Sequence, residues 1–154
     1  MSKKTQMSIV AVAAMAAWCG PTMASDSTSG LVNIPLSAAR QNAGKIAQAT
    51  LVPLDGATEI ALVVSGVPSN VSQPPHLYTY IYRGACGSLE QQPAIEMNQH
   101  VVLGARVPQQ ASLMWKTAPI AMSELRSGDY ALVVRTSAAD GAVDIFCGNL
   151  KQAA

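Results

Sequence analysis

The residues best suited to chemistry lie between positions 76 and 87, where a histidine and three tyrosines alternate with apolar residues. Successive side chains of a β-strand point to opposite faces, so the polar set shares one face: His76, Tyr78, Tyr80 and Tyr82. The apolar set should face the core, which leaves this row on the outer face. Exposed tyrosines make good binding surfaces, because the ring supplies apolar area while the hydroxyl stays hydrogen-bonded. The alternative is that loops cover the row and each hydroxyl bonds a backbone group.

Motifs of catalysis are missing from the sequence. It has no Gly-x-Ser-x-Gly, no His-Glu-x-x-His and no glycine-rich phosphate loop, so we expect neither an enzyme nor a cofactor. Metal binding remains as an alternative, because imidazole and thioether ligands suit copper(I). Such a site would use His76, Met97 and His100, in a periplasmic copper-binding or redox-related protein. Against it, methionine is a common filler of protein cores.

The first 24 residues have the three parts of a secretory signal peptide. Two lysines precede an apolar stretch at about 9–17, and small residues end at Ala24, where we expect cleavage. The apolar stretch is too short for a bilayer, which needs about 20 residues. A lipoprotein cut before Cys19 is the alternative, but the bulky tryptophan in front of it disfavours that cut. We therefore expect a bacterial protein that is exported to the periplasm or secreted.

Removal of residues 1–24 leaves 130 of the 154 residues, which fits a flexible tail at 25–30 and a single domain at 31–154. It also removes two of the ten basic residues, so eight oppose nine acidic ones. A nucleic-acid binder needs a basic stripe, and a binder of anionic membranes needs a polybasic cluster. Neither is present, and no second apolar segment is long enough for membrane insertion. We expect a monomer that binds an unknown protein, peptide or glycan.

Cys86 and Cys147 are the only cysteines after the signal peptide. Two cysteines in an oxidising compartment normally pair, so we predict one disulfide. This bridge closes a loop of about 62 residues, for which the chain-entropy model gives roughly 4 kcal/mol of stabilisation. A reactive thiol is the weaker interpretation, because no histidine or second thiol lies nearby in sequence to activate Cys86.

Segments rich in Val, Ile, Leu, Thr and Tyr, separated by Gly, Pro and Asp, predict an all-β domain. The expected strands are 31–36, 45–54, 59–65, 76–82, a weaker one at 94–103, 112–117, 129–136 and 143–150. Asp55-Gly56 predicts a hairpin turn, 122–126 fits one helical turn, and 37–49 fits either a helix or a loop. Trp115 alternates with core candidates and is expected to be packed. The pattern favours an antiparallel sandwich or barrel.

Three separated motifs give the chain a family resemblance. They are Tyr-Ile-Tyr-Arg-Gly-Ala-Cys-Gly at 80–87, Gly-Asp-Tyr-Ala-Leu-Val-Val-Arg at 128–135 and Cys-Gly at 147–148. In order and spacing they resemble His-Ile-His-x-Gly-x-Cys-Gly, Gly-(Asp/Glu)-(Tyr/Phe)-Ala-x-x-x-His and the terminal Cys-Gly of exported copper–zinc superoxide dismutase-like domains. The resemblance covers roughly residues 45–150. It implies a Greek-key β-sandwich with the Cys86–Cys147 bridge in the family's position.

The same motifs depart from the family at every metal-ligand position. Tyr80 and Tyr82 stand where the family has two histidines, and Arg135 stands where it has the later one. A copper–zinc site needs about six histidines and an aspartate, whereas this chain has two histidines. A fixed cation at Arg135 would also repel a divalent metal. If buried, that cation needs a partner, and Asp144 on the neighbouring strand is our expectation.

The sequence therefore predicts a metal-free superoxide dismutase-like scaffold that is not an enzyme. We expect it to act by binding a partner, or as a structural or antigenic protein of the envelope or cell exterior. The expected binding surface consists of His76, Tyr78, Tyr80, Tyr82, Arg83, Arg135 and the loops around 68–75 and 84–98.

Overall fold

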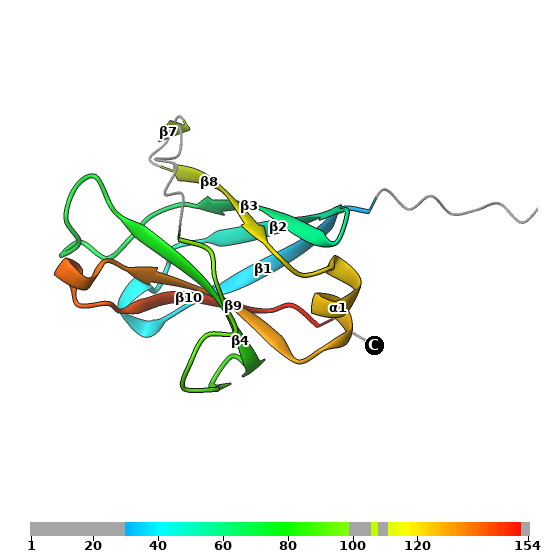
Figure 1. Cartoon of the computed structure of the whole chain (residues 1–154). Coiled ribbons are helices and arrows are strands. Elements are labelled where there is room, and N and C mark those ends of the chain that lie inside the picture. The colour runs from blue at the N-terminus through cyan, green and yellow to red at the C-terminus, as the bar shows by residue number, and fades with distance from the viewer. Residues whose placement is uncertain (1–29, 99–105, 108–110, 152–154) are drawn as a thin grey trace, which may run out of the picture.

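Strands rich in apolar residues build most of the computed structural model, which describes residues 30–98, 106–107 and 111–151 (Figure 1). The strands are β1 (Val32–Ala38), β2 (Ala47–Leu54), β3 (Ala57–Val64), β4 (Leu77–Ala85), β5 (Ser88–Leu89), β6 (Ile95–Glu96), β7 (Arg106–Val107), β8 (Ala111–Ala118), β9 (Tyr130–Thr136) and β10 (Asp144–Asn149). The helices are the short α1 (Met122–Ser127) and two 3₁₀ turns, η1 (Arg40–Asn42) and η2 (Ala138–Asp140). The chain is therefore all-β, as its sequence predicts.

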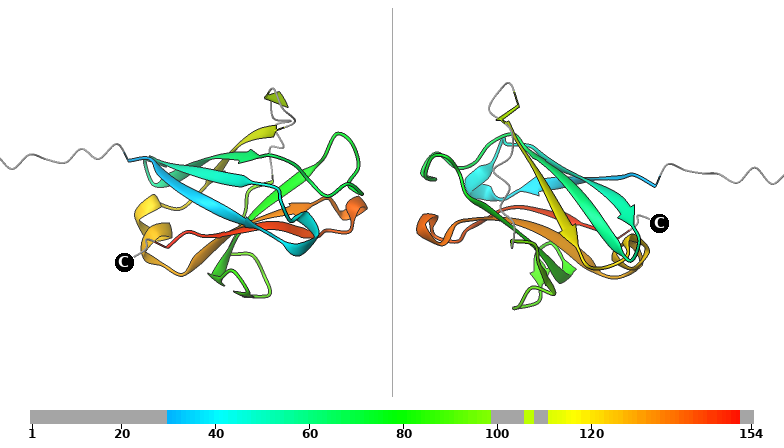
Figure 2. Two further views of the ribbon diagram at one scale, coloured as in Figure 1. Left: turned by 180° about the vertical axis from the view of Figure 1, so that it is seen from behind. Right: turned by 45° about the horizontal axis from the view of Figure 1, so that its top comes forward.

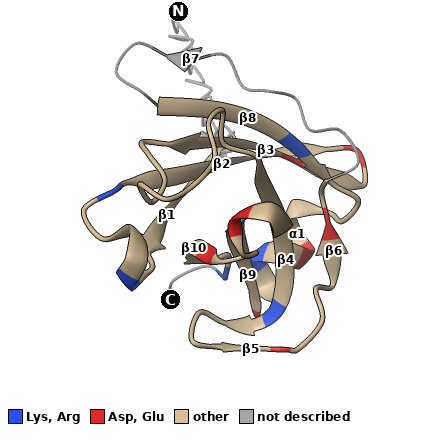
Figure 3. Cartoon of the chain, turned by 90° about the vertical axis from the view of Figure 1, so that its left-hand side faces the viewer, with Lys and Arg blue, Asp and Glu red and all other residues tan. Residues whose placement is uncertain are grey.

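The strands form one antiparallel sheet that curls into a half-barrel. Their order is β5-β4-β9-β10-β1-β2-β3-β8-β7, and β6 pairs with the outer edge of β4. Viewed end-on, the sheet runs from β8 through β3, β2, β1, β10 and β9 to β4, and the two ends of this path turn toward each other (Figure 3). The connections from β3 to β4 and from β8 to β9 cross between the two ends of the sheet (Figure 2).

The core fills the inside of this curl. Alternate residues of β2 and β3 are fully or nearly fully buried, and every residue of β9 except Arg135 is buried. The largest of the fully buried side chains are Phe146, Leu51, Ile60, Leu62, Ile81 and Leu125. Leu125 comes from α1, which packs against β2 and covers one end of the half-barrel. Burial of such side chains, at about 1.5–3 kcal/mol each, is the main force that holds the curl together.

Most predicted elements are confirmed within a few residues. The Asp55-Gly56 turn joins β2 to β3, because Leu54 and Ala57 are paired residues on either side of it. The helical alternative for residues 37–49 is wrong: β1 runs to Ala38, and only the single turn η1 separates it from β2. The expected strand at 94–103 is present as the two-residue β6, and residues 99–103 lie outside the described part of the chain.

One prediction about packing is wrong. Trp115 is 47% exposed on the outer face of β8, and its neighbour Lys116 is buried instead. The register with β3 decides this, since Lys116 pairs with the fully buried Ile60 and Trp115 pairs with Ala61. Among the residues described, no helix has the length and hydropathy to cross a membrane.

Candidate functional site

Four side chains from three adjacent strands form a cluster on the outer face of the sheet. We call it the Tyr–Arg–Asp cluster: Tyr80 and Tyr82 from β4, Arg135 from β9 and Asp144 from β10. The guanidinium carbon of Arg135 lies 5.1 Å from the ring centroid of Tyr80 and 5.8 Å from that of Tyr82. The Arg135 Nε donates to Oδ1 of Asp144 at 2.5 Å. The two rings lie 6.2 Å apart, so the guanidinium is held between two aromatic surfaces and a carboxylate.

Strand register brings these residues together from distant parts of the sequence. β4 and β9 are antiparallel neighbours, and Arg135 of β9 is paired with Tyr78 of β4. Tyr80 lies two residues further along β4 on the same face, so it is the diagonal neighbour of Arg135. On its other side Arg135 is paired with Asp144 of β10. The expected partner of Arg135 is thus confirmed. The cluster follows from three strands that lie side by side and carry aromatic, basic and acidic residues on one face.

Arg135 carries its positive charge at neutral pH and well above it. Its hydrogen bond and ion pair with Asp144 raise the pKa of the guanidinium above its already high ordinary value. Burial raises the pKa of the Tyr80 phenol, and the nearby positive charge of Arg135 only partly offsets that effect. The phenol therefore stays protonated at neutral pH. Because about a quarter of the Arg135 side chain and 43% of the Asp144 side chain are exposed, the ion pair contributes at most about 1 kcal/mol.

The tyrosine row is on the outer face, as expected, but its members differ in exposure. Tyr82 is buried, with 4% of its surface exposed, whereas Tyr78 and Tyr80 are half-buried and His76 is exposed. Arg83 does not belong to this surface, which corrects the expectation from sequence. It lies on the opposite side of β4, where its guanidinium carbon is 5.2 Å from the ring centroid of Tyr130, a member of the core.

The disulfide holds a turn against the same outer face. Cys86, in the turn between β4 and β5, is bonded to Cys147 of β10, with 5.9 Å between the Cα atoms. The Cys86 backbone N–H also donates to Oδ1 of Asn149 at 2.8 Å. Because β9 lies between β4 and β10, the turn must reach across β9. Ala131 and Val133 of β9 are fully buried yet lie outside the core cluster, which fits their place beneath this crossing.

Gly84 makes this turn possible. Its φ is +94°, a backbone conformation that side chains disfavour, and a Cβ there would overlap the carbonyl oxygen of Ser88. A residue with a side chain at this position would push β5 away from β4. The glycine therefore sets the direction in which Cys86 leaves the strand.

The residues of the metal alternative are not brought together in the described part of the chain. Met97 is 5% exposed and belongs to the core cluster, whereas His76 is exposed just before β4. His100 lies outside the described residues. Within the described ranges no three His, Cys, Asp or Glu side chains gather as metal ligands do.

Asp140 fastens the loop around residues 68–75 to η2, the turn that joins β9 to β10. The backbone N–H and the hydroxyl of Ser72 both donate to Asp140 Oδ1, at 2.9 and 2.6 Å. The hydroxyl of Ser137 donates to Asp140 Oδ2 at 2.7 Å. These hydrogen bonds, first those from Ser72 and then that from Ser137, lower the pKa of the Asp140 carboxyl.

We therefore expect acid to loosen this loop through Asp140. A carboxyl with a lowered pKa in the folded state adds stability above its unfolded pKa, and that stability is lost as pH falls through the folded pKa. Asp140→Asn should lower the free energy of unfolding at pH 7 and should flatten its decline below about pH 4. Urea denaturation of both proteins between pH 7 and pH 2 measures this. Asp55→Asn, at the exposed tip of a hairpin, is the control and should keep the wild-type slope; equal slopes for Asp140→Asn and wild type would contradict the prediction.

The Tyr–Arg–Asp cluster offers groups for binding rather than a poised acid–base pair. Arg135 holds its charge, the Tyr80 phenol holds its proton, and Asp144 is engaged with Arg135. Comparisons of the chain with protein-family models, with curated proteins and with solved structures find no match. What the cluster does must therefore follow from its own chemistry.

Proposed function

We propose that this chain is an exported, non-enzymatic binding protein on a superoxide dismutase-like Greek-key scaffold that has no metal centre. It would act in the periplasm or outside the cell. The observation that carries the proposal is the Tyr–Arg–Asp cluster, which stands where the resemblance places three metal-binding histidines. A stacked, permanently charged guanidinium is a recognition group and not a reactive one.

Three features support the scaffold. Positions 80, 82 and 135 come from separate motifs and lie together on one face, as metal-ligand positions must. Cys86 and Cys147 are bonded, in the position that the resemblance implies. The sheet also has crossing connections, from β3 to β4 and from β8 to β9, which a Greek-key path requires and a simple meander lacks.

The chemistry of the cluster favours a metal-free protein. A divalent cation beside Arg135 would meet a fixed positive charge that no accessible pH removes. Tyrosine binds metals as the phenolate, and burial disfavours that form at Tyr80. The arginine and the tyrosine therefore both disfavour metal binding at positions where the resemblance places metal-binding histidines.

The same replacements favour binding. Tyr78, Tyr80 and Arg135 are all partly exposed on one face, so a partner can reach both apolar and charged groups there. Arg135 is already held by Asp144 and by two rings, so little side-chain freedom is lost when a partner engages it. Tyrosine and arginine are also the residues that most often dominate binding energy at interfaces.

Restoring histidines tests the scaffold and the absence of a metal together. We expect the purified wild type to carry no stoichiometric copper or zinc and to leave superoxide intact. Tyr80→His/Tyr82→His/Arg135→His should bind Zn²⁺ at least about tenfold more tightly than wild type, because imidazole is a zinc ligand and the cation is gone. Elemental analysis and isothermal titration measure both. The control is Tyr80→Phe/Tyr82→Phe/Arg135→Met, which removes the same groups without adding ligands.

The outcomes separate the two halves of the proposal. If the wild-type protein holds one equivalent of metal, or dismutates superoxide, the proposal of a metal-free protein is wrong. A folded histidine variant that binds zinc no better than the control would contradict the proposal of a dismutase-like scaffold.

A second experiment tests binding. Capture of a partner from envelope extract should be lost in Tyr78→Ala and kept in Thr117→Ala, because Thr117 lies at the other end of the sheet.

A further inference from the structure

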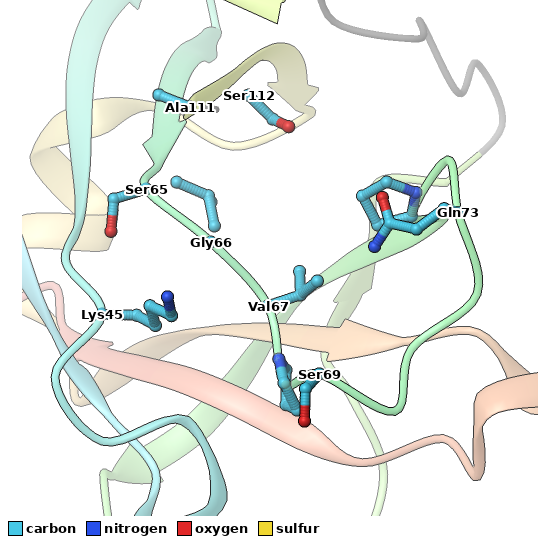
Figure 4. A pocket seen from close by; sticks show the side chains of 11 residues that line it. Lys45, Ser65, Gly66, Val67, Ser69, Gln73, Ala111 and Ser112 are labelled. Atoms are coloured by element: carbon cyan, nitrogen blue, oxygen red, sulfur yellow. The ribbon is translucent and has the colours of Figure 1, made fainter. Parts of the chain in front are cut away.

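A cavity of about 510 Å³ lies at one end of the half-barrel, apart from the Tyr–Arg–Asp cluster (Figure 4). Its walls come from the end of β3 and the segment after it, from the loop around 68–75 and from the start of β8. The volume is within the usual range of small-molecule sites, about 300–1,000 Å³. None of its lining residues belongs to the cluster.

The polar part of the lining carries a positive charge and no negative one. It contains the Lys45 ammonium, the hydroxyls of Ser65, Ser69 and Ser112 and the Gln73 amide, and no described lining residue is an Asp or a Glu. Lys45 and Gln73 extend toward each other from opposite walls (Figure 4). The rest of the lining is apolar and includes Val67. An anion with an apolar body is the ligand that such a wall complements.

Lys45 is an exposed residue whose stem packs along an ordered segment of the cavity wall. Lys45 lies across Gly66, where a Cβ would come within 3.1 Å of Lys45 Cδ and 3.2 Å of Cε. The backbone of Gly66 is itself held, because its carbonyl oxygen accepts a hydrogen bond from the Asn42 side chain at 3.4 Å. Asn42 is only 2% exposed, and its Oδ1 has no hydrogen-bond partner among the described residues. The exposed Lys45 therefore lies over a half-buried backbone segment that the buried Asn42 holds in place.

Ser65 lies in the same wall, but its hydroxyl is turned toward β2. Its Oγ accepts a hydrogen bond from the Ile46 backbone N–H at 2.7 Å. The polar side chains that extend into the cavity are Lys45 and, from the opposite wall, Gln73 (Figure 4). They offer a charged donor and a neutral amide donor to an anionic oxygen.

We infer that this cavity binds a small organic anion, which consists of an apolar body with one carboxylate or phosphate group. The anionic group lies against Lys45 and the Gln73 amide, and the apolar body lies against Val67 and the prolines of the neighbouring loop. The inference is independent of the proposed function of the Tyr–Arg–Asp cluster. Either can fail without the other.

Titration with simple probes tests it on the mature chain. Hexanoate and phenyl phosphate carry both parts of the ligand; hexanamide lacks the charge and inorganic phosphate lacks the apolar body. We expect the first two to shift the NMR signals of Gly66 and Ser65 with saturation, and the second two to bind at least about tenfold more weakly. The better of hexanoate and phenyl phosphate identifies which anionic group the site prefers.

Variants locate the site. Lys45→Gln keeps the length of the side chain and should weaken binding of the better probe about tenfold, because a hydrogen bond to a charged group is lost. Ser112→Ala should weaken it about threefold. Lys151→Gln, which removes an equal charge from an exposed lysine paired with Asp129, should change nothing. Equal affinity for hexanoate and hexanamide, or equal losses in Lys45→Gln and Lys151→Gln, would overturn the inference.

Discussion

The double variant Cys86→Ser/Cys147→Ser should lose about 4 kcal/mol of its free energy of unfolding. The bridge closes a segment of 61 residues in sequence separation, and opening it frees the unfolded chain more than the folded one. Against a net stability of about 5–15 kcal/mol for a domain, this loss leaves little reserve. Urea denaturation at pH 7 measures it, provided that the unfolding transition stays two-state.

The reduced wild type is the matched control for this variant. Its loss of stability under a reductant should equal that of the double serine variant, because both open the same loop. A loss below about 1 kcal/mol in both would show that the unfolded chain already holds the two segments together. The folded sheet should persist in either case, since β4 and β10 remain joined through β9.

The strands of this fold could be predicted from sequence because their signals are local. Alternation of apolar residues marks β2, continuous apolar runs mark β3 and β9, and Asp55-Gly56 marks the turn between β2 and β3. The segment 37–49 shows the limit of such signals. Its alanines favour a helix, but alternate burial of Ala47 and Ala49 makes the second half a strand. Tertiary burial overrides the weak intrinsic preference of alanine.

The candidate site was predictable only in part. The pairing of Arg135 with Asp144 follows from two adjacent strands joined by a short turn, which the sequence indicates. Arg83 was misplaced, although the period-two rule itself puts it on the opposite face from Tyr80 and Tyr82. The burial of Tyr82 depends on segments distant in the sequence. No local pattern carries that information.

The cavity beside Lys45 had no signal in the sequence. Its residues come from three separate stretches, and each stretch alone looks like ordinary loop or strand end. Lys45 became notable only when the structure placed it across Gly66. Sites of this kind depend on the curl of the sheet, which sets how far apart the loop around 68–75 and the start of β8 lie.

Lys116 is the residue whose position the sequence pattern predicted least well. β8 presents Met114, Lys116 and Ala118 to the inside and Trp115 to the outside, although the tryptophan is the more apolar. A slip of one residue against β3 would reverse these faces, but it would also expose Met114 and Ala118. Two buried apolar residues thus hold the register and bring a lysine inside with them.

This arrangement leaves an ammonium group in the protein interior. Lys116 is 5% exposed, and its Nζ has no hydrogen-bond partner among the residues that the structure describes. Burial lowers the pKa of the Lys116 ammonium below its ordinary value of 10.5. The folded state therefore releases a proton at lower pH than the unfolded state does. Stability due to this group is lowest below the folded pKa and rises with pH between the folded and unfolded values.

We therefore expect Lys116→Met to raise the free energy of unfolding by about 2 kcal/mol at pH 7, because it keeps the aliphatic stem and removes the buried charge. The gain over wild type should shrink as pH rises toward 10.5, where the wild-type lysine becomes neutral in both states. Urea denaturation at pH 7, 9 and 10 measures this gain.

Two further variants bracket the result. Lys116→Arg should be less stable than wild type, since a guanidinium cannot lose its charge in the interior. Lys151→Met, at an exposed lysine, should stay within about 0.5 kcal/mol of wild type. If Lys116→Met instead destabilises the protein by more than about 1 kcal/mol, the ammonium has a partner that stabilises it. In that case the lysine contributes a stabilising contact, and its burial is not merely a consequence of the register of β8.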